Sequence, residues 1–136
     1  MSIATLILGQ SGTGKSTSLR NLNPADVLLI QAIKKPLPFR SKDWQPLTKD
    51  GGNVYVCDAA AKICQVIEKT QKQIIVIDDF QYIMANEFMR RSQEKGYDKF
   101  NDIGRHTWDV FDALLKLPDD VRVYILSHTE ETDSGQ

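Results

Sequence analysis

The chain has 136 residues, a length that suits one domain with a single hydrophobic core. Hydrophobic residues make up 41% of it and charged residues 26%, and the formal net charge is −1. These values exclude an intrinsically disordered chain and a protein whose overall charge attracts nucleic acid. Two cysteines are too few for a disulfide framework, and no apolar stretch reaches the length of a membrane span. We therefore expect a cytoplasmic protein with no membrane partner.

The most specific motif follows the first predicted strand, the apolar run of residues 3–8. Residues 9–16 match the phosphate-binding loop pattern G-x-x-x-x-G-K-[ST] at every defined position, and a predicted helix begins at Ser16. In such a loop the backbone N–H groups and the helix N-terminus bind phosphate, Lys15 reaches the β- and γ-phosphates, and the Ser16 hydroxyl binds Mg²⁺. The expected contacts to ATP or another nucleoside triphosphate are Gly9, Gln10, Ser11, Gly12, Thr13, Gly14, Lys15, Ser16 and Thr17. The alternative is a glycine-rich turn that matches by chance.

Strands and helices alternate along the rest of the chain. Buried or half-buried strands are predicted at residues 27–30, 54–56, 74–77 and 121–126. A helix is predicted from 59 to about 70, and residues 34–49 are predicted to form a long loop. Two more helices are predicted from apolar residues at helical spacing, one with Phe80, Ile83, Met84 and Phe88 and the other with Trp108, Phe111 and Leu115 together with Val110 and Leu114. This order predicts an α/β domain with a mainly parallel sheet of about five strands.

A pair of acidic residues ends the strand predicted at 74–77. A carboxylate at the C-terminal tip of a strand beside the phosphate-binding loop can hold Mg²⁺, usually through water, and we assign this role to Asp78. Asp79 is the nearest candidate for the base that activates water, although it is one methylene shorter than the glutamate of many ATPases. The alternative for both residues is an aspartate in a turn or a helix cap.

Polar residues also end the last predicted strand, at Ser127 and His128. They fall where ATPases with a phosphate-binding loop place a polar sensor of the γ-phosphate. His128 could donate a hydrogen bond to the γ-phosphate or to the attacking water, and the alternative is a histidine that faces solvent.

In their order, these motifs resemble those of the RecA-like P-loop ATPases, and more closely the small phage nucleotide-binding proteins implicated in single-strand annealing. The resemblance rests on residues 9–16, 74–82 and 121–129. It implies a P-loop NTPase with a three-layer α/β/α fold over residues 1–136 and a homo-oligomer with sites at subunit interfaces. It also implies ATP, Mg²⁺ and single-stranded DNA as ligands.

Two features depart from that family. A catalytic glutamate usually follows the second strand, but Ile30-Gln31-Ala32-Ile33 offers none, so either Asp79 takes its role or turnover is slow. The family also continues beyond residue 136 into a second DNA-binding loop. The resemblance therefore implies either a truncated chain or a minimal member.

The first DNA-binding loop of the family corresponds to about residues 92–104. Residues 90–105 carry five basic and three acidic side chains, with aromatic rings between them. Basic groups and aromatic rings suit single-stranded nucleic acid, because its phosphates pair with the former and its bases stack on the latter. The candidate contacts are Arg90, Arg91, Lys95, Tyr97, Lys99 and Arg105. The alternative is a solvated helix face with its aromatic rings on the core.

The function that these features favour is ATP binding and hydrolysis coupled to single-stranded DNA, in phage-type recombination or replication. One alternative is a phosphotransferase of the nucleotide-kinase type, which would need an arginine-rich lid, and Arg90-Arg91 is the only arginine pair. Another is a nucleotide-dependent binding module with little turnover.

Overall fold

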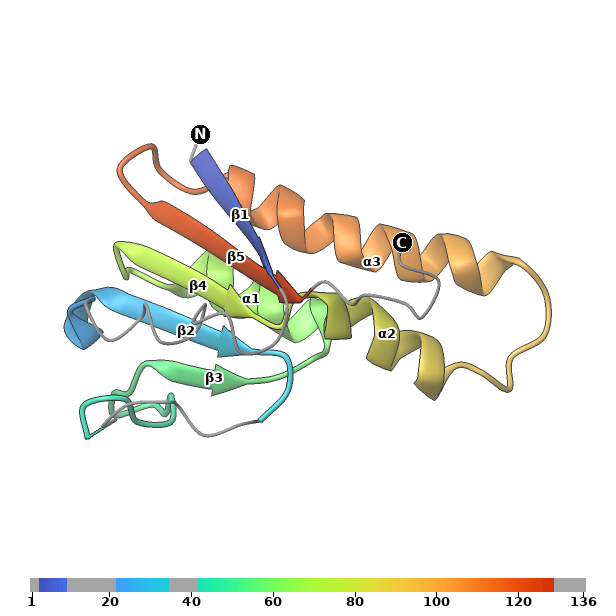
Figure 1. The fold of residues 1–136 in the computed structure, drawn as a ribbon, viewed down its shortest axis with the longest axis horizontal. Helices are drawn as coiled ribbons and strands as arrows, with labels where there is room; N and C mark the ends of the chain where they lie inside the picture. The colour runs from blue at the N-terminus through green and yellow to red at the C-terminus, as the bar shows by residue number, and fades with distance from the viewer. Residues whose placement is uncertain (1–2, 10–21, 35–41, 129–136) are drawn as a thin grey trace.

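A computed structural model describes residues 3–9, 22–34 and 42–128 of the chain (Figure 1). All paired strands of its single sheet run parallel, in the spatial order β1-β5-β4-β2-β3. The strands are β1 (Ile3–Gly9), β2 (Val27–Gln31), β3 (Val54–Val56), β4 (Ile74–Asp78) and β5 (Arg122–His128). The α-helices are α1 (Ala60–Lys69), α2 (Gln81–Arg90) and α3 (Asp98–Leu115), and a 3₁₀ turn, η2 (Pro24–Asp26), precedes β2. The structure confirms the predicted α/β class with a parallel sheet and is compatible with a Rossmann-like fold.

The three described α-helices cover one face of the sheet. The apolar stripe of each helix and alternate residues of the central strands form one buried cluster, because side chains of a strand point to opposite faces in turn. Its strand members are Leu28, Ile30, Ile75, Ile77, Val123 and Ile125, and its helix members include Ile63, Ile67, Ile83, Val110 and Leu114. This cluster fixes how α1, α2 and α3 lie on the sheet.

A second buried cluster lies on the opposite face, where Trp44 packs with Val27, Leu29, Val76 and Leu126. Trp44 belongs to the region that the sequence predicts as a long loop, and no periodicity marks it as a core residue. The loop is held in place by Asn53. The Asn53 side chain accepts from the Gln45 N–H at 2.9 Å and donates to the Pro24 carbonyl at 3.1 Å. The helix predicted from Ser16 lies outside the described residues.

Helix α3 differs from its prediction in two respects. It begins at Asp98, so the second half of the loop expected at residues 92–104 is helical. Trp108, expected on the apolar face, is 63% exposed, whereas Val110 and Leu114 are buried as predicted. Thr107, one turn before Val110, is also buried. Its hydroxyl donates to the Ile103 carbonyl at 3.1 Å, so the hydroxyl is hydrogen-bonded without water.

The two tryptophans provide a matched test of this packing. Trp44→Ala should destabilise the protein by about 3–5 kcal/mol, because the substitution leaves a cavity beneath the sheet. Trp108→Ala should cost less than about 1 kcal/mol, since most of that ring is in solvent. Urea unfolding of both variants measures the difference, and equal losses would contradict the assignment of Trp44 to the core.

Candidate nucleotide site at the carboxyl edge of the sheet

All the predicted catalytic strand ends meet at one edge, because the strands are parallel. In the register of the sheet, Gly9 pairs with His128, and Ile77 pairs with Ile125. Strand β5 therefore lies between β1 and β4, so the strand that ends at Asp78 is not adjacent to the strand that leads into the predicted loop. With neighbouring strands about 4.8 Å apart, the two strand ends are separated by roughly 10 Å. That distance allows a carboxylate to reach a bound Mg²⁺ through water.

Asp78 is almost fully buried at the end of β4. Ile75 and Ile77 point toward the helices and Val76 to the other face, so the alternation places Asp78 on the face opposite the helices. Its strand neighbour is Gln31, which is also buried at the end of β2. The amide of Gln31 thus lies beside Asp78, at the end of the second strand. The resemblance to RecA-like proteins predicts a glutamate just after this strand.

Asp79 has a left-handed backbone conformation, with φ of 56°, and its side chain is buried. Asp and Asn tolerate this region better than other residues with a side chain, and such conformations cluster at functional sites. The main chain on both sides of Asp79 is hydrogen-bonded. Phe80 N–H donates to the Leu126 carbonyl, and Tyr82 N–H donates to the Asp79 carbonyl, each at 3.0 Å. The sharp turn after β4 is therefore defined by contacts to β5 and to α2.

Ser127 contacts α2 at the same turn. Its hydroxyl donates to Oε1 of Gln81 at 2.9 Å, so Ser127 faces the helices while Asp78 faces the other way. The sequence prediction gave Gln81 no role. The one signal that could have pointed to it is its polar side chain two positions after the acidic pair. The main chain of His128 lies beside Gly9. The predicted loop residues from Gln10 to Thr17 and the side chain of His128 lie outside the described residues.

Beyond this edge, α2, the connection 91–97 and the first turns of α3 extend past the strand ends (Figure 1). We call residues 81–105 the α2–α3 arm. Arg91 joins the two helices of the arm, since its guanidinium donates to Glu87 at 2.9 Å, to Glu94 at 2.8 Å and to Asp102 at 3.1 Å. The hydrogen bonds that Arg91 donates, first to Glu94 and then to Glu87 and Asp102, raise the pKa of Arg91 further above its already high value. Arg91 is thus held by three carboxylates of its own chain.

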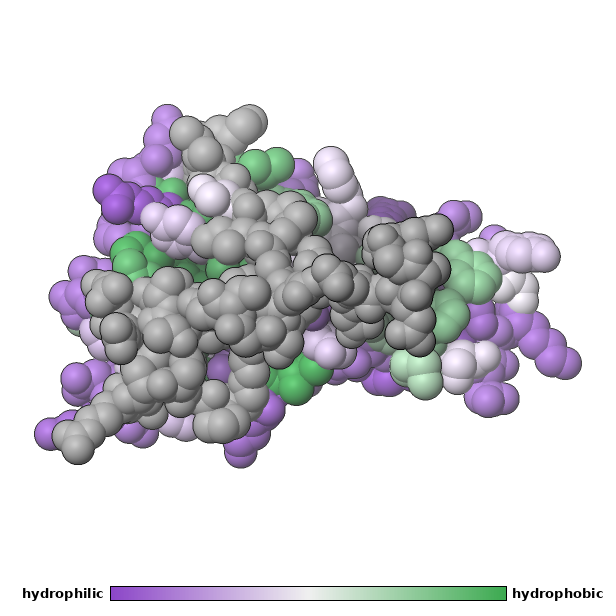
Figure 2. All heavy atoms as spheres, in the orientation of Figure 1, coloured by the Kyte–Doolittle hydropathy of each residue, from purple (hydrophilic) through white to green (hydrophobic). Residues whose placement is uncertain are grey.

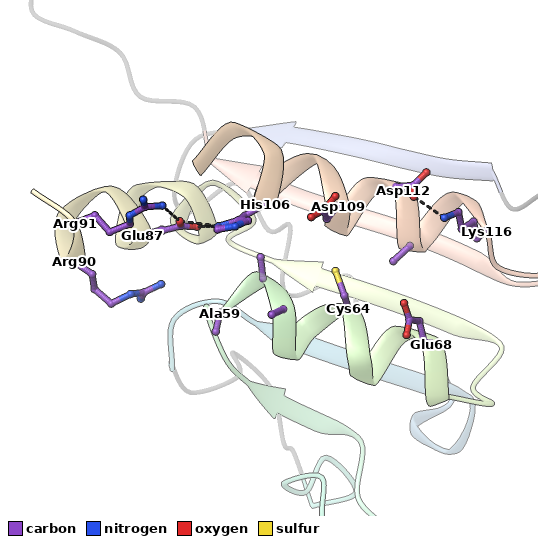
Figure 3. A pocket seen from close by; sticks show the side chains of 13 residues that line it. Ala59, Cys64, Glu68, Glu87, Arg90, Arg91, His106, Asp109, Asp112 and Lys116 are labelled. Atoms are coloured by element: carbon purple, nitrogen blue, oxygen red, sulfur yellow. Dashed lines mark hydrogen bonds and ion pairs between the residues drawn. The ribbon is translucent and has the colours of Figure 1, made fainter. Parts of the chain in front are cut away.

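Glu87 is the buried centre of this network (Figure 3). In addition to Arg91 it contacts His106, whose Nδ1 lies 2.8 Å from Oε2 of Glu87 and donates to it in the Nδ1-protonated tautomer. The three side chains line one end of a cleft of about 580 Å³ between α1, α2 and α3. Arg90, at the same end, pairs with Asp58 at 2.9 Å. Asp78, Asp79 and Ser127 do not line this cleft, so it is separate from the strand ends.

The arm exposes aromatic and apolar side chains together with basic ones (Figure 2). Tyr97 is 86% exposed, and its ring centroid lies 6.4 Å from that of Phe100, which in turn lies 5.8 Å from Phe88. Lys99 is partly engaged, because it donates to the Glu94 carbonyl at 2.7 Å and lies over the Phe100 ring. Lys95 and Arg105 are exposed, and none of the described ion pairs includes either of them.

No family model matches the chain, and no curated protein matches it. Among the described residues, no three His, Cys, Asp or Glu side chains are grouped as a metal site. In the same part of the chain, no helix combines the length and the apolar character that a bilayer-spanning helix needs.

The network around Arg91 can be tested by exchanging a charged side chain for an unbranched apolar one. Arg91→Met should lower the urea midpoint of unfolding, because buried Glu87 loses a hydrogen-bond donor. Lys95→Met, in the same connection between helices, should leave the midpoint near that of the wild type. If the two variants unfold alike, Arg91 does not hold α2 to α3.

Proposed function

We propose that the protein is a Mg²⁺-dependent ATPase of the RecA-like type that acts on single-stranded DNA. The observation that supports it best is the register of the sheet. Strand β1 ends at Gly9, the first residue of the phosphate-binding motif, and the buried pair Asp78 and Asp79 ends a strand of the same edge, with only β5 between them. A phosphate-binding loop and an acidic strand end at one edge are two of the parts that hydrolysis of a nucleoside triphosphate requires.

In this proposal, Lys15 and the loop backbone bind the phosphates, and Ser16 and Asp78 hold Mg²⁺, Asp78 through water. A water molecule attacks the γ-phosphorus, and the bond from that phosphorus to the oxygen bridging it to the β-phosphate breaks. Asp79 accepts the proton of the water, and His128 donates a hydrogen bond to the γ-phosphate. The products are ADP and inorganic phosphate, and the charge that develops on the phosphate oxygens is stabilised by Lys15 and Mg²⁺.

We extend the proposal to the layers of the fold. The described helices cover one face, and the other face carries a second set of apolar side chains that pack with Trp44. A helix that begins at Ser16 and packs on that second face would complete the three-layer arrangement of the RecA-like P-loop NTPases.

The proposed DNA contacts lie on the arm. The exposed ring of Tyr97 offers a stacking surface, and Lys95 and Arg105 offer charges that no described carboxylate neutralises. The roles of Arg90 and Arg91 are different, because each is paired with acidic side chains of its own chain. We therefore assign the contacts to Lys95, Tyr97 and Arg105 rather than to the arginine pair.

One observation favours a second candidate, a nucleotide-dependent binding module with little turnover. Gln31 is buried beside Asp78, and its amide cannot take a proton from water as a glutamate would. If Asp79 is too short to reach the attacking water, the protein would bind ATP but hydrolyse it slowly.

We expect ATP hydrolysis that requires Mg²⁺ and rises when single-stranded DNA is added, measured as phosphate release with and without an oligonucleotide. Turnover only with a small phosphate acceptor would replace the proposal with a nucleotide-kinase type of reaction. ATP binding without turnover under either condition would favour the binding module.

Variants locate the activity in the assigned residues. Lys15→Ala should abolish ATP binding or turnover, whereas Lys62→Ala, an exposed lysine of α1, should not. Asp78→Asn should remove the Mg²⁺-dependent turnover. Asp79→Asn tests the base by itself, since asparagine tolerates the left-handed backbone of this position. Full activity of Lys15→Ala would refute the phosphate-binding loop.

The DNA surface is tested by the salt dependence of binding to an oligonucleotide. Lys95→Ala and Arg105→Ala should each weaken binding and reduce the slope of log K against log salt by about 0.7 for each phosphate that the removed cation neutralises. Tyr97→Ala should weaken binding with little change of slope, because stacking releases no counterions. Lys69→Ala, at the exposed end of α1, is the control. Equal slopes in all four variants would place the DNA elsewhere.

A further inference from the structure

The turn from Asp78 to Gln81 is tied to both neighbouring strands. On the β2 side, Ala32 N–H donates to the Asp78 carbonyl at 3.2 Å. On the β5 side there are two ties, the main-chain bond from Phe80 to Leu126 and the bond from the Ser127 hydroxyl to Gln81. The bond to Gln81 is the only one of these three that depends on side chains, so it is the tie that a substitution can remove without breaking the backbone pairing.

The direction of this bond decides what Ser127 can do. A serine hydroxyl has a single hydrogen, and here it is donated to Oε1 of Gln81. Ser127 therefore cannot donate to a phosphate oxygen at the same time, and it faces the helices rather than the face of Asp78. In this arrangement Ser127 anchors the end of β5 to α2.

Asp79 lies between the bond that ties Asp78 to the β2 side and the bond that ties Phe80 to β5, in a backbone conformation that is unfavourable for a residue with a side chain. Such a conformation persists only where the surroundings hold it. Loss of the bond to Gln81 removes one of the two described ties to β5 and leaves the main-chain bond from Phe80 to Leu126. The turn is then held less firmly, and Asp79 can relax. A carboxylate displaced by about 1 Å from an attacking water loses much of its effect as a base.

We propose that Gln81 is a positioning residue for ATP hydrolysis, which holds the turn after β4 against Ser127 so that Asp79 stays in place. This inference rests on the proposed ATPase function and on Asp79 as its base. Gln81 acts through the turn and contacts neither nucleotide nor metal in this proposal.

The test is Gln81→Met, because methionine is similar in size and flexibility but cannot accept a hydrogen bond at that atom. We expect kcat for ATP to fall about tenfold or more, with KM changed less than about twofold, since the substitution affects the chemical step rather than binding. Gln65→Met, the same exchange on the exposed side of α1, is the matched control and should keep the wild-type kcat.

Ser127 completes the test. Ser127→Ala should lower kcat as Gln81→Met does. The double variant should be no slower than either single variant, because both substitutions remove the same hydrogen bond. Ser127→Thr keeps the hydroxyl and should lose less activity than Ser127→Ala. Wild-type kcat in Gln81→Met, or additive losses in the double variant, would overturn the positioning role of Gln81 and leave the ATPase proposal standing. Absence of turnover in the wild type would instead overturn the ATPase proposal, and this inference with it.

Discussion

The parallel pairing of β5 with both β1 and β4 is the constraint on which the rest of the structure depends. It brings the end of the strand before the phosphate-binding motif, the polar end of β5 and the acidic end of β4 to a single edge. It also sets how far each strand end extends along the strand direction, because the register pairs Gly9 with His128. The same sheet carries the apolar residues on which α1, α2 and α3 pack. The candidate site is thus a consequence of how the core is assembled.

The alternation of side chains along the strands divides the polar residues of this edge between two faces. Asp78 follows Val76 to the face opposite the helices, whereas Ser127 follows Ile125 to the helix face. One face can therefore serve a ligand while the other secures the framework. The turn that contains Asp79 connects the two faces, since it begins at Asp78 and ends at Gln81, which Ser127 contacts.

In the α2–α3 arm, the number of basic residues does not predict how many of them carry an unpaired charge. Arg90 and Arg91 look equivalent to Lys95 and Arg105 in the sequence, but folding pairs the first two with carboxylates from α2, α3 and the residue Asp58. These ion pairs join the helices of the arm and leave a smaller charge for any partner. The exposed rings with Lys95 and Arg105 are the part of this surface to which we assign DNA contacts in the proposed function.

The sequence alone determined the α/β class, the positions of the parallel strands to within a residue or two, and the acidic pair at the end of β4, because these depend on local periodicity and on short motifs. Only the tertiary structure decided that β5 separates β1 from β4, that Trp44 covers the second face, that residues 98–104 are helical and that Gln81 receives the Ser127 hydroxyl. The strand order, the cover by Trp44 and the bond to Gln81 are contacts between segments far apart in the chain, and the helix at residues 98–104 is joined to α2 through Arg91 and Asp102. Strand order, burial and side-chain partners depend on such contacts, and no local pattern of residues encodes them.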